Sequence, residues 1–287
     1  MNRLTTLAAV ATAAASIVVL SAASAAGAGT HPSTTAAAKA ARAVLRDMTA
    51  NLPVTDQVVP GTRHHVRALT KVDYYNWSGY ADDTSRGNTY TKVSGRWAEP
   101  AITCPTKETQ VAIFWAGIDG FTSSTVEQNG TIAECYQGTA FYYTWWEMYP
   151  TNFIQVVGST VKPGDHIAAS VVRTGTSYKL NLTDSSRSGD NISKTETCTT
   201  CANTSAEWIA ETPSQSRGYT PLPDFKTWTV SSASVTSGTT GSINAFPDDQ
   251  ITMVGAGGIV QPGYPLATPG ALNTAGTGFS VKWDNSY

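Results

Sequence analysis

The feature that most constrains the fold of this 287-residue chain is an aromatic segment at residues 141–149, FYYTWWEMY. In an extended strand, successive side chains point to opposite faces. One face would carry Phe141, Tyr143, Trp145, Glu147 and Tyr149. The intervening aromatic residues would lie on the other face, so a strand of this composition must be covered on both sides. The glutamate indicates either the floor of a binding cleft or a doubly buried strand whose one carboxylate reaches solvent.

Composition extends this expectation to the rest of the chain. Only 14% of the residues are charged, while Ser, Thr, Gly, Tyr and Trp are abundant. The segments lack helical periodicity, which favours an antiparallel β-sandwich or barrel. We read Asn129-Gly130 as a hairpin turn. The pattern predicts strands at residues 75–80, 90–97, 110–118, 141–149, 167–173, 178–184, 206–211, 226–231, 251–254 and 279–283.

The first residues have the pattern of an export signal. Arg3 precedes an apolar run at residues 4–20, and Ala-Ser-Ala at 23–25 matches a cleavage site, so residues 1–25 are expected to be a signal peptide. No later run approaches the roughly 20 apolar residues that span a bilayer. We therefore predict a secreted, extracellular protein without a membrane partner.

Residues 26–72 differ from the sequence that follows. Residues 34–50 are rich in alanine and predict a helix. Seven basic and two acidic residues precede Asp73, which leaves 12 of the 19 basic and 19 of the 21 acidic residues in 73–287, a net charge of −7. A basic leader before an acidic domain favours an inhibitory propeptide held by charge, with 73–287 as the catalytic domain. The alternative is a flexible extension without a regulatory role.

The four cysteines predict two disulfides in an exported chain. We expect pairing between Cys104 and Cys135 and between Cys198 and Cys201, although four cysteines allow three connectivities. A zinc site at Cys198-x-x-Cys201 is the competing interpretation, but the second ligand pair that it requires is missing. We therefore expect neither a metal nor another cofactor.

Several classes of function are excluded by missing residues. The one histidine after Asp73 is His166, which follows a Pro-Gly-Asp turn, and no nucleophile elbow accompanies it. No basic cluster with interleaved aromatic residues suggests nucleic acid as a partner. Carboxylates and amides on aromatic strands remain as the candidate chemistry.

Five segments resemble, in order and at compatible spacing, the motifs of the glutamic peptidases (eqolisins). They are WSG at 77–79, WAGIDG at 115–120, VEQNG at 126–130, WWEMYP at 145–150 and AEWIAE at 206–211. The resemblance implies a concanavalin-like β-sandwich of two packed antiparallel sheets with a concave substrate cleft. It also implies a secreted, monomeric, acid-active endopeptidase that is made with a propeptide and cleaves polypeptides.

The family's catalytic pair of one Gln and one Glu maps onto Gln128 and Glu211, with Glu207 as the alternative glutamate. Three features depart from the family pattern, at Tyr143, Glu127 and residues 212–213, and bear on substrate preference. The positions that match the family's cleft are Trp77, Gly79, Trp115, Asp119, Trp145, Glu147 and Tyr149.

The chemistry of these two side chains suits peptide hydrolysis. A glutamate can take a proton from water and then return it to the leaving nitrogen, while the glutamine NH₂ can donate to the oxyanion. With an ordinary glutamate pKa of about 4.3, such a site would work in mild acid.

Two other functions remain open from the sequence. The first is a carbohydrate-binding sandwich without catalysis, because aromatic sheets also stack sugars. The second is a glycoside hydrolase using Glu147 and Glu211, which would need carboxyl groups about 5–9.5 Å apart.

Overall fold

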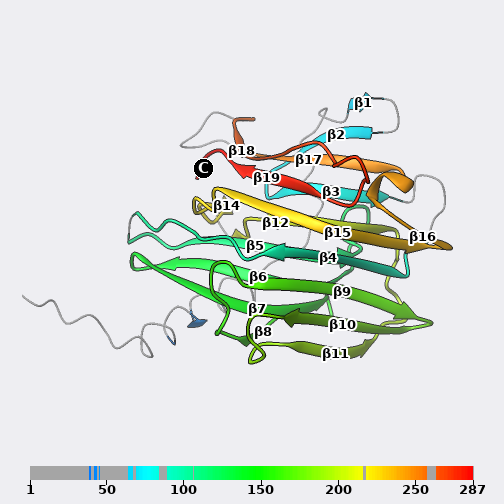
Figure 1. The fold of residues 1–287 in the computed structure, drawn as a ribbon, viewed down its shortest axis with the longest axis horizontal. Coiled ribbons are helices and arrows are strands. Elements are labelled where there is room, and N and C mark those ends of the chain that lie inside the picture. The colour runs from blue at the N-terminus through cyan, green and yellow to red at the C-terminus, as the bar shows by residue number, and fades with distance from the viewer. Residues whose placement is uncertain are drawn as a thin grey trace, which may run out of the picture.

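The computed structural model describes residues 39, 42, 43, 45, 64–66, 69–83, 89–105, 107–215, 218–256 and 263–286. Nearly all of these residues lie in strands or the turns between them (Figure 1). The strands form two packed sheets that are antiparallel except for one parallel pair, which confirms the predicted β-sandwich. The predicted signal peptide at residues 1–25 lies outside the described residues.

The first sheet contains the aromatic segment. Its strand order is β1-β2-β17-β3-β12-β5-β6-β7-β8, and the parallel pair is β2 with β17. Strand β2 spans the expected boundary between residues 72 and 73. The bounds are β1 His64–Val66, β2 Leu69–Tyr74, β3 Trp77–Asp83, β5 Gln110–Ile118, β6 Val126–Tyr136, β7 Thr139–Tyr149, β8 Asn152–Gly158, β12 Ser205–Glu211 and β17 Asp248–Val254.

The second sheet has the order β16-β15-β4-β9-β10-β11. Strand β15 joins the two sheets, because its first half pairs with β19 and its second half pairs with β4. A hairpin, β13–β14, and a short 3₁₀ helix, η1, complete the described elements. The remaining bounds are β4 Lys92–Ala98, β9 His166–Thr174, β10 Ser177–Asp184, β11 Ile192–Thr197, β13 Ser214–Gln215, β14 Gly218–Tyr219, β15 Thr227–Ser237, β16 Thr239–Gly241, η1 Ile243–Ala245, β18 Pro265–Pro269 and β19 Phe279–Trp283.

Both faces of the first sheet are apolar, as the aromatic segment predicts. Phe114, Trp146 and Trp208 belong to the core between the two sheets. Trp115 and Trp145 belong to a second buried cluster, most of whose residues come from the opposite face of the first sheet. We call this opposite face the first-sheet outer face. The strand period of two explains the division, because neighbouring residues of one strand enter different clusters.

The prediction of a turn at Asn129-Gly130 is wrong. Both residues lie within β6, and the hairpin turn between β6 and β7 falls at Gln137-Gly138, where both φ angles are positive. Gly130 has a different role, because a Cβ there would overlap the carbonyl oxygen of Phe114 on β5. The glycine permits close approach of two strands rather than a reversal of the chain.

The two predicted disulfides are confirmed. Cys104 bonds to Cys135 and Cys198 bonds to Cys201, and no described cysteine is free. No helix among the described residues has the length and apolar character needed to cross a membrane.

Part of the predicted leader helix is also described. Lys39, Arg42, Ala43 and Leu45 are helical, whereas the other residues of 34–50 lie outside the described part of the chain.

Candidate active site

The first half of the candidate site is a hydrogen bond between Gln128 and Glu147. The residues lie directly opposite each other on β6 and β7, and Gln128 Nε2 donates to Glu147 Oε2 at 2.6 Å. Both side chains are almost completely buried, at 3% and 4% exposure. Gly117 of β5 pairs with Gln128, and a Cβ at Gly117 would press against the glutamine side chain. The glycine therefore makes room for the amide.

The second half surrounds Glu211 at the end of β12. Its Oε2 accepts a hydrogen bond from Trp115 Nε1 at 2.8 Å, and its Oε1 accepts a longer one from Asn76 Nδ2 at 3.4 Å. Glu211 is only partly buried. The carboxylate is thus held by neutral donors and has access to the surface.

The pKa values connect the two halves. Burial raises the pKa of Glu211 from the ordinary glutamate value to about 7, although hydrogen bonds from its neutral donors act to lower the pKa. Burial also raises the pKa of Glu147 to about 8, with a smaller upward contribution from the nearby charge of Glu211, although the hydrogen bond from Gln128 lowers the pKa. The two carboxyl groups therefore share one electrostatic environment. With the leader present, the pKa of Glu211 is therefore higher than the ordinary glutamate value expected from the sequence.

Glu207, the alternative glutamate, has a different environment. It shares a row across the sheet with Gly117 and Gln128, so its backbone lies in register with the glutamine. Its side chain is fully buried, and burial together with the charge of Asp119 raises its pKa well above the ordinary value. Glu211 is thus partly exposed at the end of β12, whereas Glu207 is completely buried.

Two of the predicted cleft tryptophans lie around Glu211. The ring of Trp77 meets that of Trp115 edge-on at 5.0 Å and stacks on that of Tyr74 at 5.7 Å. Trp145 is fully buried in the same cluster and pairs with Gly130 on β6. These rings form an apolar surround that accounts for the desolvation of the glutamate.

The other predicted cleft residues mainly support the fold around the candidate site. Asp119 accepts hydrogen bonds from the backbone N–H groups of Asn203 and Thr204, both at 2.7 Å, so it fastens two loops. Gly79 lies where a Cβ would overlap the backbone of β12. Tyr149 lies at the end of β7, with its ring edge-on to Phe153. The structure therefore places Asp119 and Gly79 in the supporting framework.

The described leader residues contact the same face of the sheet. Leu45 is completely buried in the cluster that contains Trp77 and Trp115. Arg42 Nη2 donates to the carbonyl oxygens of Val156 and Val157 on β8, at 2.9 and 3.0 Å. The leader is thus anchored beside the candidate site by one apolar and one polar contact.

Sequence reasoning missed Asn76 and did not identify which leader residue is buried. Asn76 lies 135 residues before Glu211, and no local pattern marks a contact at that separation. Its position directly before the Trp-Ser-Gly motif is the only signal in the sequence.

The described residues provide no credible metal centre. The one group with three potential ligand atoms close together is Glu127, Cys198 and Cys201. Both sulfur atoms are in a disulfide, so they cannot act as thiolate ligands.

Comparisons with known proteins identify the family and the fold. Residues 75–257 match the Peptidase A4 family. Aspergillopepsin-2 of Aspergillus niger is 27% identical over 206 residues, which cover 63% of this chain and 72% of that protein. Scytalido-glutamic peptidase, solved with a transition state analog inhibitor, has a TM-score of 0.60 and 23% identity over 73% of this chain and 98% of that one. SCP-B, an eqolisin solved with the tripeptide Ala-Ile-His, has a TM-score of 0.56 and 22% identity, with the same coverage.

Proposed function

The chain belongs to the Peptidase A4 family, the glutamic endopeptidases, and on that premise we propose that Gln128 and Glu211 carry its reaction. The observation that supports this pair is that Glu147, the hydrogen-bond partner of Gln128, lies close enough to Glu211 for the charge of Glu211 to raise its pKa. The substrates are polypeptides, and the reaction is hydrolysis of internal peptide bonds in acid solution.

In this proposal, ionised Glu211 acts first as a base and then as an acid. It takes a proton from a water molecule as the water oxygen bonds to the peptide carbonyl carbon. The carbonyl oxygen becomes an oxyanion, to which the Gln128 NH₂ group donates a hydrogen bond. Protonated Glu211 then gives its proton to the amide nitrogen as the C–N bond breaks, which regenerates the carboxylate. Trp115 and Asn76 orient the glutamate throughout.

Glu147 is a positioning residue in this scheme. With a pKa of about 8, it is protonated in acid and has one O–H group to donate. If that O–H donates to the amide oxygen of Gln128, the amide NH₂ is free to face the substrate. Ionised Glu147 can only accept, so it would retain the NH₂ group and turn the amide oxygen towards the substrate. Protonation of Glu147 thus favours the catalytic orientation.

The leader is proposed to inhibit the enzyme until it is removed. Leu45 is buried in the cluster that also contains the tryptophans beside Glu211, and Arg42 fixes the leader to β8. Burial raises the pKa of Glu211 to about 7, so below that pH the carboxyl group is mostly protonated and cannot act as a base. Removal of the leader would rehydrate Glu211 and lower its pKa towards the acid range.

The cellular setting follows from the same proposal. The predicted signal peptide and the two disulfides support export to an oxidising environment, with residues 26–72 as the propeptide and 73–287 as the processed enzyme. We propose a monomer without a cofactor, nucleic acid or membrane partner.

The test is proteolysis by the purified, processed protein. We expect it to hydrolyse an unfolded protein such as reduced casein between about pH 3 and 5 in the presence of pepstatin, an inhibitor of aspartic peptidases. The variant Gln128→Ala should lose this activity while keeping its near-UV circular dichroism. No hydrolysis by a folded, leader-free protein would refute the proposal.

A further inference from the structure

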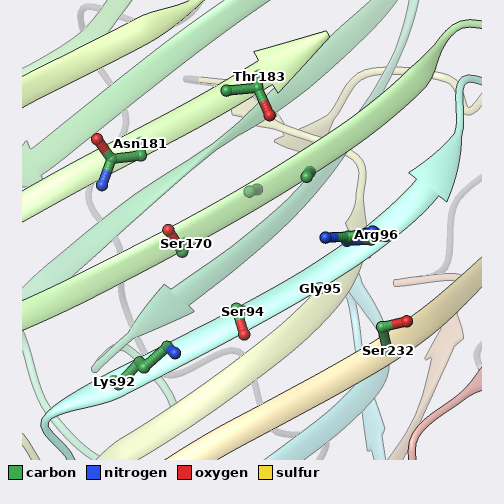
Figure 2. A pocket seen from close by; sticks show the side chains of 10 residues that line it. Lys92, Ser94, Gly95, Arg96, Ser170, Asn181, Thr183 and Ser232 are labelled. Carbon is green, nitrogen blue, oxygen red and sulfur yellow. The ribbon is translucent and has the colours of Figure 1, made fainter. Parts of the chain in front are cut away.

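A groove crosses the outer face of the second sheet, on the opposite side of the sandwich from Glu211. It consists of two adjoining hollows of about 510 Å³ and 640 Å³ that share Arg96, Ala168 and Thr183. Figure 2 shows the first of these hollows. Strands β4, β9, β10 and β15 supply the lining. We call this feature the second-sheet groove.

Small polar side chains create the groove. Ser94, Ser170 and Asn181 lie side by side on β4, β9 and β10. The next row contains Arg96, Ala168 and Thr183 in the same order. Apart from Arg96, these side chains are short, so they leave a hollow in the sheet surface between longer side chains. Hydroxyl and amide groups along its floor offer both hydrogen-bond donors and acceptors.

The charge of the groove is opposite to that of the domain. Residues 73–287 have a net charge of −7, yet β4, β9 and β15 contain no acidic residue. The single acid of β10, Asp184, is buried. The cationic lining residues are Lys92 and Arg96, His166 lies at one end of the groove, and exposed Lys179 lies beyond them on β10. The groove is therefore a positive strip on an acidic molecule.

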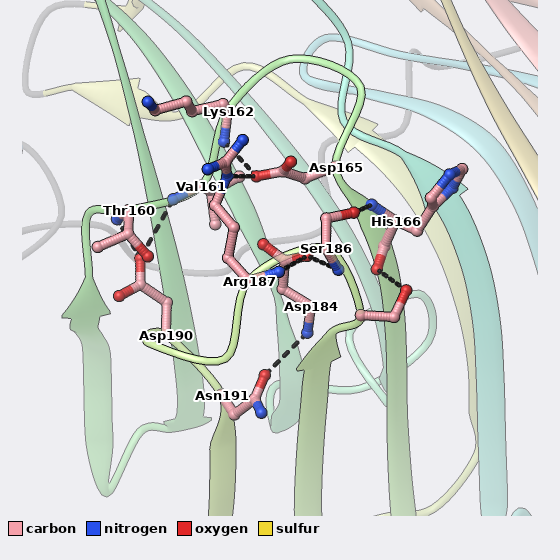
Figure 3. Close-up of polar contacts among 11 residues, drawn as sticks. Thr160, Val161, Lys162, Asp165, His166, Asp184, Ser186, Arg187, Asp190 and Asn191 are labelled. Atoms are coloured by element: carbon pink, nitrogen blue, oxygen red, sulfur yellow. Dashed lines mark hydrogen bonds and ion pairs between the residues drawn. The ribbon is translucent and has the colours of Figure 1, made fainter.

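The acids near the His166 end already have partners. Asp165 accepts a hydrogen bond from Arg187 Nε at 2.7 Å, and Asp184 accepts from the backbone N–H of Ser186 at 2.8 Å (Figure 3). By contrast, no ion pair involves the side chains of Lys92, Arg96 or His166 within the described part of the chain. Their charges are available to a ligand.

From this charge and lining we infer that the second-sheet groove binds an acidic polysaccharide, a polymer of uronic acid residues. Lys92 and Arg96 are four residues apart on one strand, about 13 Å, so they can contact separate carboxylates of one extended chain. Serine, threonine and asparagine side chains between them would bond sugar hydroxyl groups.

A protein partner fits this surface less well. Protein interfaces depend on buried aromatic or other large anchors. The large apolar side chains that border the groove, Trp97 and Ile167, are directed into the core, at 3% and 2% exposure. Because the groove and the candidate active site lie on opposite outer faces, an enzyme held on an acidic polymer could still accept a polypeptide substrate.

The experiment measures binding of polygalacturonate by titration calorimetry at pH 5 in low salt, with dextran as the neutral polymer. The double variant Lys92→Ala/Arg96→Ala should weaken polygalacturonate binding about tenfold or more and reduce its dependence on salt. The matched control Lys226→Ala/Lys282→Ala removes two exposed lysines that pair with Asp224 and Asp284, and it should bind as the unchanged protein does.

Peptidase activity of both double variants should equal that of the unchanged enzyme, which separates this inference from the proposed function. Three results would overturn it: equal weakening in both double variants, equal binding of dextran, or tighter binding of a single-stranded DNA oligomer than of polygalacturonate. Failure of peptide hydrolysis with polygalacturonate binding intact would refute only the proposed function.

Discussion

The buried carboxyl group of Glu99 makes the stability of this protein depend on pH in a calculable way. Glu99 directly follows β4 and is 2% exposed. Burial raises its pKa to about 8, with a smaller upward contribution from the nearby carboxylates of Asp165 and Asp184, although Thr131 and Trp97 act in the opposite direction. In the unfolded chain its pKa returns to the ordinary value of 4.5.

Between these two pKa values the native state binds one more proton than the unfolded state. The contribution of Glu99 to the free energy of unfolding therefore falls as pH rises from about 4.5 to about 8, and this contribution is constant above that range. The slope is about 1.4 kcal/mol per pH unit for one group. Glu99→Gln removes this titration, so from pH 5 to pH 7 the variant should gain about 2–3 kcal/mol relative to the parent.

The assay is urea denaturation followed by tryptophan fluorescence at pH 5, 6 and 7. The parent should carry Glu211→Gln to prevent self-digestion. Glu108→Gln, which removes an exposed carboxyl group, is the matched control for the change in net charge. If the free energy of unfolding had the same pH dependence in Glu99→Gln and its parent, the reasoning would be refuted. The buried carboxyl group would then titrate alike in the folded and unfolded states.

Three further predictions concern the site, the leader and the packing. In the parent enzyme, ionisation of Glu147 should make kcat/KM fall on the alkaline side, at a pH no higher than about 8. Glu147→Gln keeps a hydrogen-bond donor for Gln128 but has no ionisable group, so this fall should disappear from the pH profile. Leu45→Asp in the full-length chain should release activity before processing, measured with a fluorogenic peptide, because it places a charge in a buried cluster. Gly130→Ala should lower the free energy of unfolding by about 1–3 kcal/mol in urea, since its Cβ overlaps β5.

The sequence predicted those features that depend on local pattern. Alternation in residues 141–149 correctly indicated a strand covered on both faces, because side-chain direction depends only on the strand period. The Asn-Gly pair at 129–130 gave a wrong prediction, because its local preference for a turn is outweighed by close packing against β5. Tertiary packing overrides a two-residue signal.

Features that depend on distant residues could not be predicted in this way. The Asn76–Glu211 contact joins residues 135 positions apart in the sequence, and the burial of Leu45 depends on its packing against the first sheet. The raised pKa of Glu211 also follows from its surroundings rather than from its identity. Family resemblance supplied the candidate pair, whereas the structure supplied the difference in access between Glu211 and Glu207.

The most direct test of the account compares Glu211→Gln with Glu207→Gln in the leader-free enzyme, as kcat/KM for one peptide at about pH 4. Glu211→Gln removes the proposed base, so kcat/KM should fall about 10²–10⁴-fold. Glu207 has a pKa well above the ordinary value and is already neutral there, so its replacement by a neutral amide should change kcat/KM less than tenfold. Near-normal activity of Glu211→Gln, with loss in Glu207→Gln, would contradict the account.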